Sequence, residues 1–162
     1  MSDAADTRGI VAAREAGIAF EVMRTQRARS AEESAGLQGI VLGQLLRTIV
    51  VRRGADDYVF VLVPGGRRID WAKLRAHLRI RRISLPDKDE AFEATGYERG
   101  AITPFGSSHA WPVIADETVG VAGDRVAIGG GAHGVNLHIA TADLIEATNA
   151  TVADVTEPEP EG

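Results

Sequence analysis

One glycine-rich segment constrains the fold of this chain more than any other: residues 96–106 read GYERGAITPFG. Three glycines and a proline within eleven residues exclude a continuous helix or a regularly paired strand, because proline lacks a backbone donor and glycine weakens both elements. The segment follows an apolar, helix-like stretch. We therefore predict a shaped loop that exposes backbone N–H and C=O groups.

A second glycine-rich segment, GGGAHG, spans residues 129–134. It matches the G-x-G-x-x-G spelling of dinucleotide sites, but such a site needs a helix directly after the glycines to hold the pyrophosphate. Here Val135, Leu137 and Ile139 alternate with Asn136 and His138, which predicts a half-buried strand. The segment is then either a loop that brings backbone amides close to a ligand or a tight turn between strands.

Short apolar runs fill most of the remaining chain. The β-branched runs at 45–53 and 58–63 flank turn-forming residues and predict a hairpin. This irregular mixture of short elements predicts an α+β domain with a mixed, mostly antiparallel sheet. Further strands are expected at 18–23, 111–115, 125–128, 134–139 and 151–155, and helices at 8–17, 30–36, 71–79, 86–96 and from residue 141.

Several helices carry start signals in the sequence. Ser30 and Glu33 form an S-x-x-E capping box, and Asp70 is placed to cap the helix at 71–79. Pro86 suits the opening turn of the next helix. Thr141 is expected to cap the last one.

The length of 162 residues predicts one domain, which we assign to residues 1–155. Residues 156–162, TEPEPEG, are expected to form a disordered acidic tail. The lack of cysteine excludes disulfides and thiol nucleophiles supplied by the protein. No apolar run approaches the roughly 18 residues of a membrane span, and the polar start is unlike a signal peptide. We expect a cytoplasmic protein with no membrane partner.

Charge is divided unevenly along the chain. Residues 1–82 carry 15 Lys and Arg against 9 Asp and Glu, a net charge of +6, whereas residues 83–162 carry 3 against 14, a net charge of −11. Electrostatic fields act over about 8–10 Å, so the most basic stretch, residues 67–82, would attract a polyanion despite the acidic total. A solvated basic face without a ligand is the alternative.

Other candidate constellations do not match a known catalytic or metal site. Ser107, Ser108 and His109 are adjacent in sequence, which rarely gives the geometry of a catalytic triad, and no G-x-S-x-G elbow surrounds them. The four histidines lack the spacing of a zinc site. We therefore expect no metal and no cofactor.

Five segments, in order, resemble the YbaK/EbsC family of aminoacyl-tRNA editing domains, which includes free-standing deacylases and the editing insertion of bacterial prolyl-tRNA synthetases. Residues 96–106 are similar to its TGY-x-x-GG-x-x-PxG signature, and residues 46–51 to its Lys-Thr-Leu strand. Residues 63–74, 129–134 and 141–153 are similar to its VPG region, its second glycine loop and its C-terminal segment.

The resemblance implies a curved, barrel-like sheet flanked by helices, with a pocket between the Lys-Thr-Leu strand and the glycine loops. It implies hydrolysis of the ester of a mischarged tRNA, such as Cys-tRNA(Pro) or Ala-tRNA(Pro), with the tRNA acceptor end and prolyl-tRNA synthetase as partners. The implied catalytic positions are Arg47, Gly100, Ala101, Gly129 and Asn136. The expected substrate contacts are Phe20, Thr48, Pro104, Phe105, Gly106, Gly130, Gly131 and His133. For Phe20, a role in the hydrophobic core is the alternative. The expected contacts to the acceptor stem are Arg67, Arg68, Lys73, Arg75, Arg79 and Arg82.

Four positions depart from the family pattern. Arg47 replaces a lysine, Gly129 a small polar residue, Asn136 an aspartate and Ala101 a glycine. An asparagine is neither a base nor an anion, so attack would fall to a positioned water or to a group on the substrate, with backbone N–H groups stabilising the oxyanion. The departures leave two other functions open: a non-catalytic tRNA- or nucleotide-binding module, and a regulator that binds a small amino acid or nucleotide.

Overall fold

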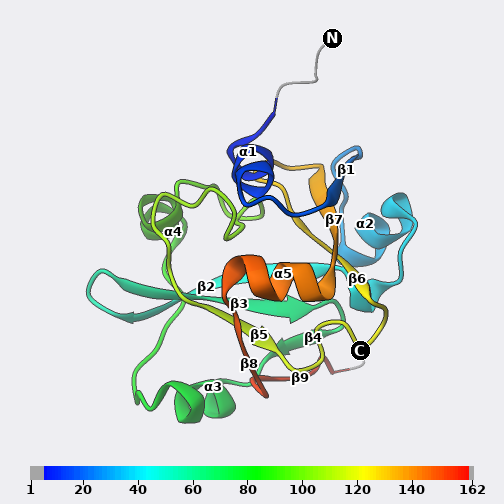
Figure 1. Ribbon diagram of the computed structural model, residues 1–162. Helices are drawn as coiled ribbons and strands as arrows, with labels where there is room; N and C mark the ends of the chain where they lie inside the picture. The colour runs from blue at the N-terminus through cyan, green and yellow to red at the C-terminus, as the bar shows by residue number, and fades with distance from the viewer. Residues whose placement is uncertain (1–5, 161–162) are drawn as a thin grey trace.

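The computed structural model describes residues 6–160, and Figure 1 shows short helices arranged around twisted sheets. The mixture confirms the α+β class. The helices are α1 (Arg8–Glu15), α2 (Ala31–Gln38), α3 (Trp71–Leu78), α4 (Lys88–Thr95) and α5 (Thr141–Thr148), with a 3-10 turn η1 (Leu42–Gln44). The strands are β1 (Phe20–Arg24), β2 (Leu46–Gly54), β3 (Asp57–Pro64), β4 (Arg67–Ile69), β5 (Val113–Asp116), β6 (Arg125–Gly129), β7 (Val135–Ala140), β8 (Thr151–Ala153) and β9 (Thr156–Pro158).

The strands form three sheets rather than a closed barrel. The orders are β2-β3-β5-β8, β1-β7-β6 and β4-β9, and an isolated bridge between Leu45 and Ala127 joins the two larger sheets. Four of the six strand pairs in the described chain are antiparallel, and the pairs β3–β5 and β5–β8 are parallel. The sheet is therefore mixed and mostly antiparallel, as the sequence predicted.

The hairpin of β2 and β3 separates two hydrophobic clusters, because successive side chains of a strand point to opposite faces. Leu46 and Val50 of β2 lie in a cluster with helices α1, α4 and α5 and with the β1-β7-β6 sheet. Val51 of β2 lies in a second cluster, which packs against Leu74 of α3. The two faces of β2 therefore meet different parts of the molecule.

Helix α1 braces both glycine-rich loops from behind. Arg8 donates to the carbonyl oxygens of Gly96 and Gly106, at 3.2 and 2.6 Å, and its guanidinium lies 5.1 Å from the ring centroid of Tyr97. The Tyr97 hydroxyl donates to the carbonyl oxygen of Phe105 at 2.6 Å. The hydroxyl of Thr7, the N-cap of α1, donates to the carbonyl oxygen of Gly130. Tertiary contacts thus fix both loops.

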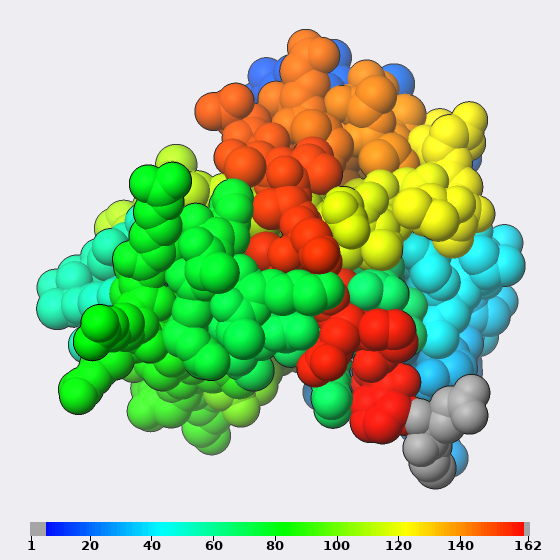
Figure 2. Space-filling view, turned by 90° about the horizontal axis from the view of Figure 1, so that it is seen from below, coloured from blue at the N-terminus to red at the C-terminus, as the bar shows by residue number. Residues whose placement is uncertain are grey.

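The C-terminal prediction is wrong at residues 156–158. They form β9, which pairs with β4 and places Val155 and Thr156 in the interior. Figure 2 shows this segment lying across the face next to α3 and β4. This segment carries no strand signal, because proline and glutamate disfavour sheets. Residues 161–162 of the predicted tail lie outside the described residues.

Two predicted helix starts are also wrong. Helix α4 begins at Lys88 with Asp87 as its N-cap, not at Pro86, because the Asp87 carboxylate accepts from the backbone N–H of Glu90 at 2.8 Å. Thr141 is the first residue of α5 and not its cap, and its hydroxyl makes no hydrogen bond with any described residue. Among the described helices, none is long and apolar enough to cross a bilayer.

Candidate functional site

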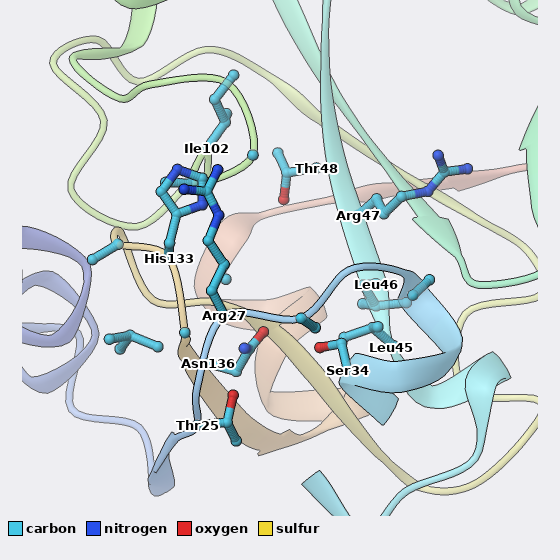
Figure 3. A pocket seen from close by; sticks show the side chains of 18 of the residues that line it. Thr25, Arg27, Ser34, Leu45, Leu46, Arg47, Thr48, Ile102, His133 and Asn136 are labelled. Atoms are coloured by element: carbon cyan, nitrogen blue, oxygen red, sulfur yellow. The ribbon is translucent and has the colours of Figure 1, made fainter. Parts of the chain in front are cut away.

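A cavity of about 530 Å³ opens where the two glycine-rich loops meet the start of β2. Its walls are the 25–30 loop after β1, the first turn of α2, residues 45–49, and the loop segments 99–102 and 132–136 with Gly129. Figure 3 shows Arg27, Thr48, His133 and Asn136 arranged around this space. It lies where the family resemblance places the pocket.

The two glycine-rich loops touch at Gly100 and His133. A Cβ atom added at Gly100 would lie 2.9 Å from Cε1 of His133, and Gly100 has a φ of +92°. The positive φ favours glycine at this position, and any larger residue would also displace the His133 ring. Gly129 comes similarly close to the first loop, since a Cβ added there would lie 3.5 Å from the carbonyl oxygen of Ile102. The loops form one continuous wall.

The charged side chains that line the cavity are all arginines: Arg27, Arg29, Arg47 and Arg99. No aspartate or glutamate lines the cavity within residues 6–160. A cleft whose walls carry one sign of charge concentrates the electric field, and forked guanidinium donors match phosphate oxygens. The cavity is therefore suited to an anionic ligand.

The structure directs the Arg47 guanidinium away from the middle of the cavity. Its Nη2 atom donates to the backbone carbonyl oxygen of Arg67 in β4, at 2.7 Å, and Figure 3 shows the side chain on the opposite side of β2 from Thr48. The reason is strand alternation: Arg47 shares a face with Ile49 and Val51, the face that packs toward α3 and β4. The family resemblance implies a catalytic position at Arg47, but the hydrogen bond engages its guanidinium at β4.

At two of the predicted site residues the backbone N–H group is already occupied. The N–H of Ala101 donates to the carbonyl oxygen of Glu98, at 2.9 Å, and that of Gly130 to Val135, at 2.8 Å. By contrast, the amides of Gly131, Ala132, His133 and Gly134 donate to no acceptor in the described chain. Three of these four residues line the cavity, so the second loop offers the freer set of donors.

Neutral polar side chains complete the lining. The hydroxyl oxygen of Thr48 is buried and has no hydrogen-bond partner among the described residues, while the Ser34 hydroxyl accepts from the Gln38 amide at 2.9 Å. Burying an unpaired hydroxyl costs free energy. A bound ligand could satisfy Thr48, and Asn136 adds an amide to the same wall.

The cavity brings together seven of the thirteen residues predicted as catalytic or substrate-binding: Arg47, Thr48, Gly100, Ala101, Gly129, His133 and Asn136. Phe20, Pro104, Phe105, Gly106, Gly130 and Gly131 are outside the lining. Phe20 is partly buried and packs on the core, which was its alternative role, and Phe105 is a core residue. The outlying glycines approach α1 and Tyr97, so they shape the loops from behind.

The basic residues predicted to contact tRNA fall into two groups. Arg68 pairs with Glu157 at 3.1 Å, Lys73 pairs with Asp154 at 2.9 Å, and Arg67 donates to the Thr156 hydroxyl at 2.7 Å. The C-terminal segment thus occupies these three. Arg75 and Arg79 instead line a separate hollow of about 350 Å³ on α3, with Arg81. Arg82 is exposed.

Sequence reasoning missed three of the cavity arginines: Arg27, Arg29 and Arg99. Arg99 lies inside the first glycine loop, whose glycines and proline predict exposed backbone groups but say nothing of this side chain. Arg27 and Arg29 lie between a strand and the capped start of α2. Two basic residues in a connecting loop are a signal for ligand binding, because binding residues often lie in loops.

The fold is an α+β domain with a mixed sheet, and its cavity lies between two glycine loops. Arginines line this cavity and no carboxylate does so among the described residues, which is typical of a domain that binds an anionic ligand. Its sequence narrows the class further. The sequence model of the aminoacyl-tRNA editing domain family matches residues 25–147, and the chain belongs to this family.

Individual relatives agree with that assignment. The chain is 29% identical over 99 residues to the proline–tRNA ligase of Thermosipho melanesiensis; the match covers 61% of this chain and 17% of the ligase. It is 25% identical over 131 residues to EbsC of Enterococcus faecalis, to which Cys-tRNA(Pro)/Cys-tRNA(Cys) deacylase activity is ascribed, covering 80% and 79% of the two chains. A crystal structure described as a trans-editing enzyme for prolyl-tRNA synthetase superposes with a TM-score of 0.84 at 25% identity, covering 93% and 95%.

Proposed function

We propose that this chain is an aminoacyl-tRNA deacylase, which hydrolyses the ester between an amino acid and the 3′-terminal adenosine of a mischarged tRNA. The observation that carries the proposal is the arginine-lined cavity without carboxylates, placed between two glycine loops. Family membership supplies the substrate class. The names of its relatives point to tRNA(Pro) charged with cysteine or another small amino acid, and to action alongside prolyl-tRNA synthetase.

The residues around the cavity suit the parts of this substrate. Arg27 and Arg29 would hold phosphate oxygens of the terminal nucleotides. Arg99 lines the cavity with them, and its Nη2 atom donates to the carbonyl oxygen of Pro86 at 3.2 Å. The free amides of residues 132–134 would stabilise the negative charge that develops on the ester carbonyl oxygen, an effect of roughly 3–4 kcal/mol per donor. Thr48 and Asn136 would contact the amino acid or the ribose. We also propose that the editing domain extends beyond residue 155 to include β9, because β9 pairs with β4.

The test is a panel of tRNA(Pro) and other tRNAs charged with cysteine, alanine, serine or proline. We expect ester loss from at least one mischarged member, and a much slower rate for the double variant Arg27→Ala/Arg29→Ala. Arg14→Ala is the matched control, since Arg14 pairs with Asp6 on α1 and does not line the cavity. Binding of every member without ester loss would instead identify a silent tRNA-binding module and refute the proposal.

A further inference from the structure

His133 stands at the point where the two glycine loops meet. It is exposed, it lines the cavity, and its Cε1 atom would lie 2.9 Å from a Cβ at Gly100. Figure 3 shows its side chain among those that surround the cavity, with Arg27 and Asn136. An imidazole at this place can reach a group bound between the loops.

The other side chains of the lining cannot take up a proton near neutral pH. Within the described chain the lining holds no Asp, Glu, Lys, Tyr or Cys. Its hydroxyl and amide side chains are not bases, and its arginines stay protonated. Imidazole is the side chain whose ordinary charge change falls between pH 5 and 8. His133 is thus the one candidate base among the described lining residues.

The remaining histidines are elsewhere. His138 points from β7 toward α2, where its Nε2 atom lies 2.9 Å from Oε1 of Gln38, and burial lowers its pKa. His109 packs beside Trp111, with ring centroids 5.2 Å apart. His77 lies in α3. None of these three histidines lines the cavity, so none competes with His133 for a bound ester.

We propose that His133 is the general base of the reaction, an inference that rests on the proposed deacylase function. Its unprotonated ring nitrogen accepts a proton from a water molecule as the water oxygen bonds to the ester carbonyl carbon. The bond between that carbon and the ribose oxygen then breaks, and the imidazolium returns the proton to the ribose oxygen. The products are the free amino acid, which ionises, and a tRNA with its terminal hydroxyl restored.

The charged residues of the lining that holds His133 are Arg27 and Arg29 of the 25–30 loop, Arg99 of the first glycine loop, and Arg47 of β2, whose guanidinium is directed toward β4. All four keep their charge throughout the range in which imidazole titrates. A rate change between pH 5 and 8 that depends on the residue at 133 therefore reports the imidazole. The α-amino group of the substrate also titrates, but it does so equally with wild-type and variant enzyme.

The experiment compares wild type, His133→Gln and His109→Gln in single-turnover deacylation of the best tRNA of the panel, from pH 5 to 9, with tRNA affinity measured in parallel. General-base catalysis contributes about 10²–10⁴-fold. We expect His133→Gln to lose at least 100-fold at the wild-type plateau and to lose the acid limb that wild type shows. Its tRNA affinity should stay within about twofold, and His109→Gln should match wild type.

Three results would overturn the assignment. His133→Gln could keep the wild-type rate, it could keep the same acid limb at a lower rate, or it could lose only tRNA affinity. Each would mean that the proton goes elsewhere, for example to a group on the substrate. If wild type itself releases no amino acid from any tRNA, the deacylase proposal fails first and takes this inference with it.

Discussion

The guanidinium of Arg47 donates a hydrogen bond to the backbone carbonyl oxygen of Arg67, with an Nη2–O distance of 2.7 Å. This contact ties β2 to β4, which in turn pairs with β9. A side chain engaged in that way serves the assembly of the sheets. Arg99 is engaged in a similar way, since its Nη2 atom donates to the carbonyl oxygen of Pro86 at 3.2 Å. Arg27 and Arg29 supply the remaining positive charge of the cavity lining.

The first prediction distinguishes Arg27, which we expect to bind tRNA, from Arg47, which connects β2 to β4. Arg27→Ala should raise KM for mischarged tRNA by about 10–100-fold, because a charge-assisted hydrogen bond is worth about 1.5–3 kcal/mol. Arg47→Ala should change KM by about twofold at most and lower the free energy of unfolding by about 1 kcal/mol. Steady-state deacylation and urea denaturation of both variants check this. The reverse ranking would return Arg47 to the site.

The fold was predictable from sequence wherever a local signal was strong. The β2–β3 hairpin, the alternation in β7 and the Ser30 and Asp70 caps were all confirmed, because each follows from side-chain periodicity or a short-range hydrogen bond. Strand β9 was not predictable. Its pairing with β4 joins residues about ninety positions apart and overrides the poor strand propensity of its own sequence.

The site was predictable in outline but not in the direction of its side chains. The glycine segments showed where the cavity walls would be. Whether Arg47 or Thr48 faced the cavity depended on the alternation phase of β2, which the two core clusters determine. A one-residue change of phase exchanges the two faces of a strand. Sequence similarity to a lysine-bearing strand could not decide that phase.

The second prediction concerns Gly100. An alanine there must adopt a φ near +92° and would press its Cβ against the His133 ring, so Gly100→Ala should lower kcat at least tenfold, in proportion to how far the ring moves. Gly17→Ala is the matched control, since Gly17 has a φ of +76° and open space around it. Both should lose about 1 kcal/mol of stability from backbone strain, measured by denaturation. Equal activities of the two variants would contradict the role of the Gly100–His133 contact.

The third prediction concerns the buried carboxylate of Asp116. Burial raises its pKa, but hydrogen bonds from Thr118, Val155 and Thr156 outweigh this and hold the pKa below its ordinary value of 3.8. A lowered pKa means that Asp116 contributes stability above pH 3.8, which is lost as the pH falls through the native-state value. Asp116→Asn should therefore unfold more easily at pH 7, by about 1–3 kcal/mol, and show a shallower loss of stability below pH 4. Urea denaturation from pH 2.5 to 7 measures both, and parallel pH curves would refute the assignment.

The fourth prediction concerns Tyr58. Burial and then the hydrogen bond to the Glu90 carboxylate raise its pKa to about 12. A raised pKa favours the folded state below about pH 10, the ordinary value for tyrosine, and this stability is lost as the pH rises toward 12. Absorbance at 295 nm should show no phenolate from Tyr58 at pH 10.5 in the native protein. Tyr58→Phe identifies its share, because Tyr97 is then the remaining tyrosine of the chain.

The last prediction tests where tRNA crosses the basic surface. Among residues 6–160, the guanidinium groups of Arg75, Arg79 and Arg82 have no ion-pair partner, whereas Arg68 and Lys73 are paired with Glu157 and Asp154. The triple variant R75E/R79E/R82E should therefore bind tRNA more weakly than the pair R68Q/K73Q. Its plot of log K against log salt should be shallower by about 2–3, since each phosphate contact contributes about 0.9 to the slope.

Fluorescence anisotropy over a series of salt concentrations measures this slope, and circular dichroism verifies that both variants are folded. The comparison is informative because the charges of Arg68 and Lys73 are already compensated within the protein, so their removal changes the local potential less. Equal slopes and affinities for the two variants would show that the hollow on α3 does not meet the phosphate backbone. The acceptor stem would then have to approach along the arginines of the cavity itself.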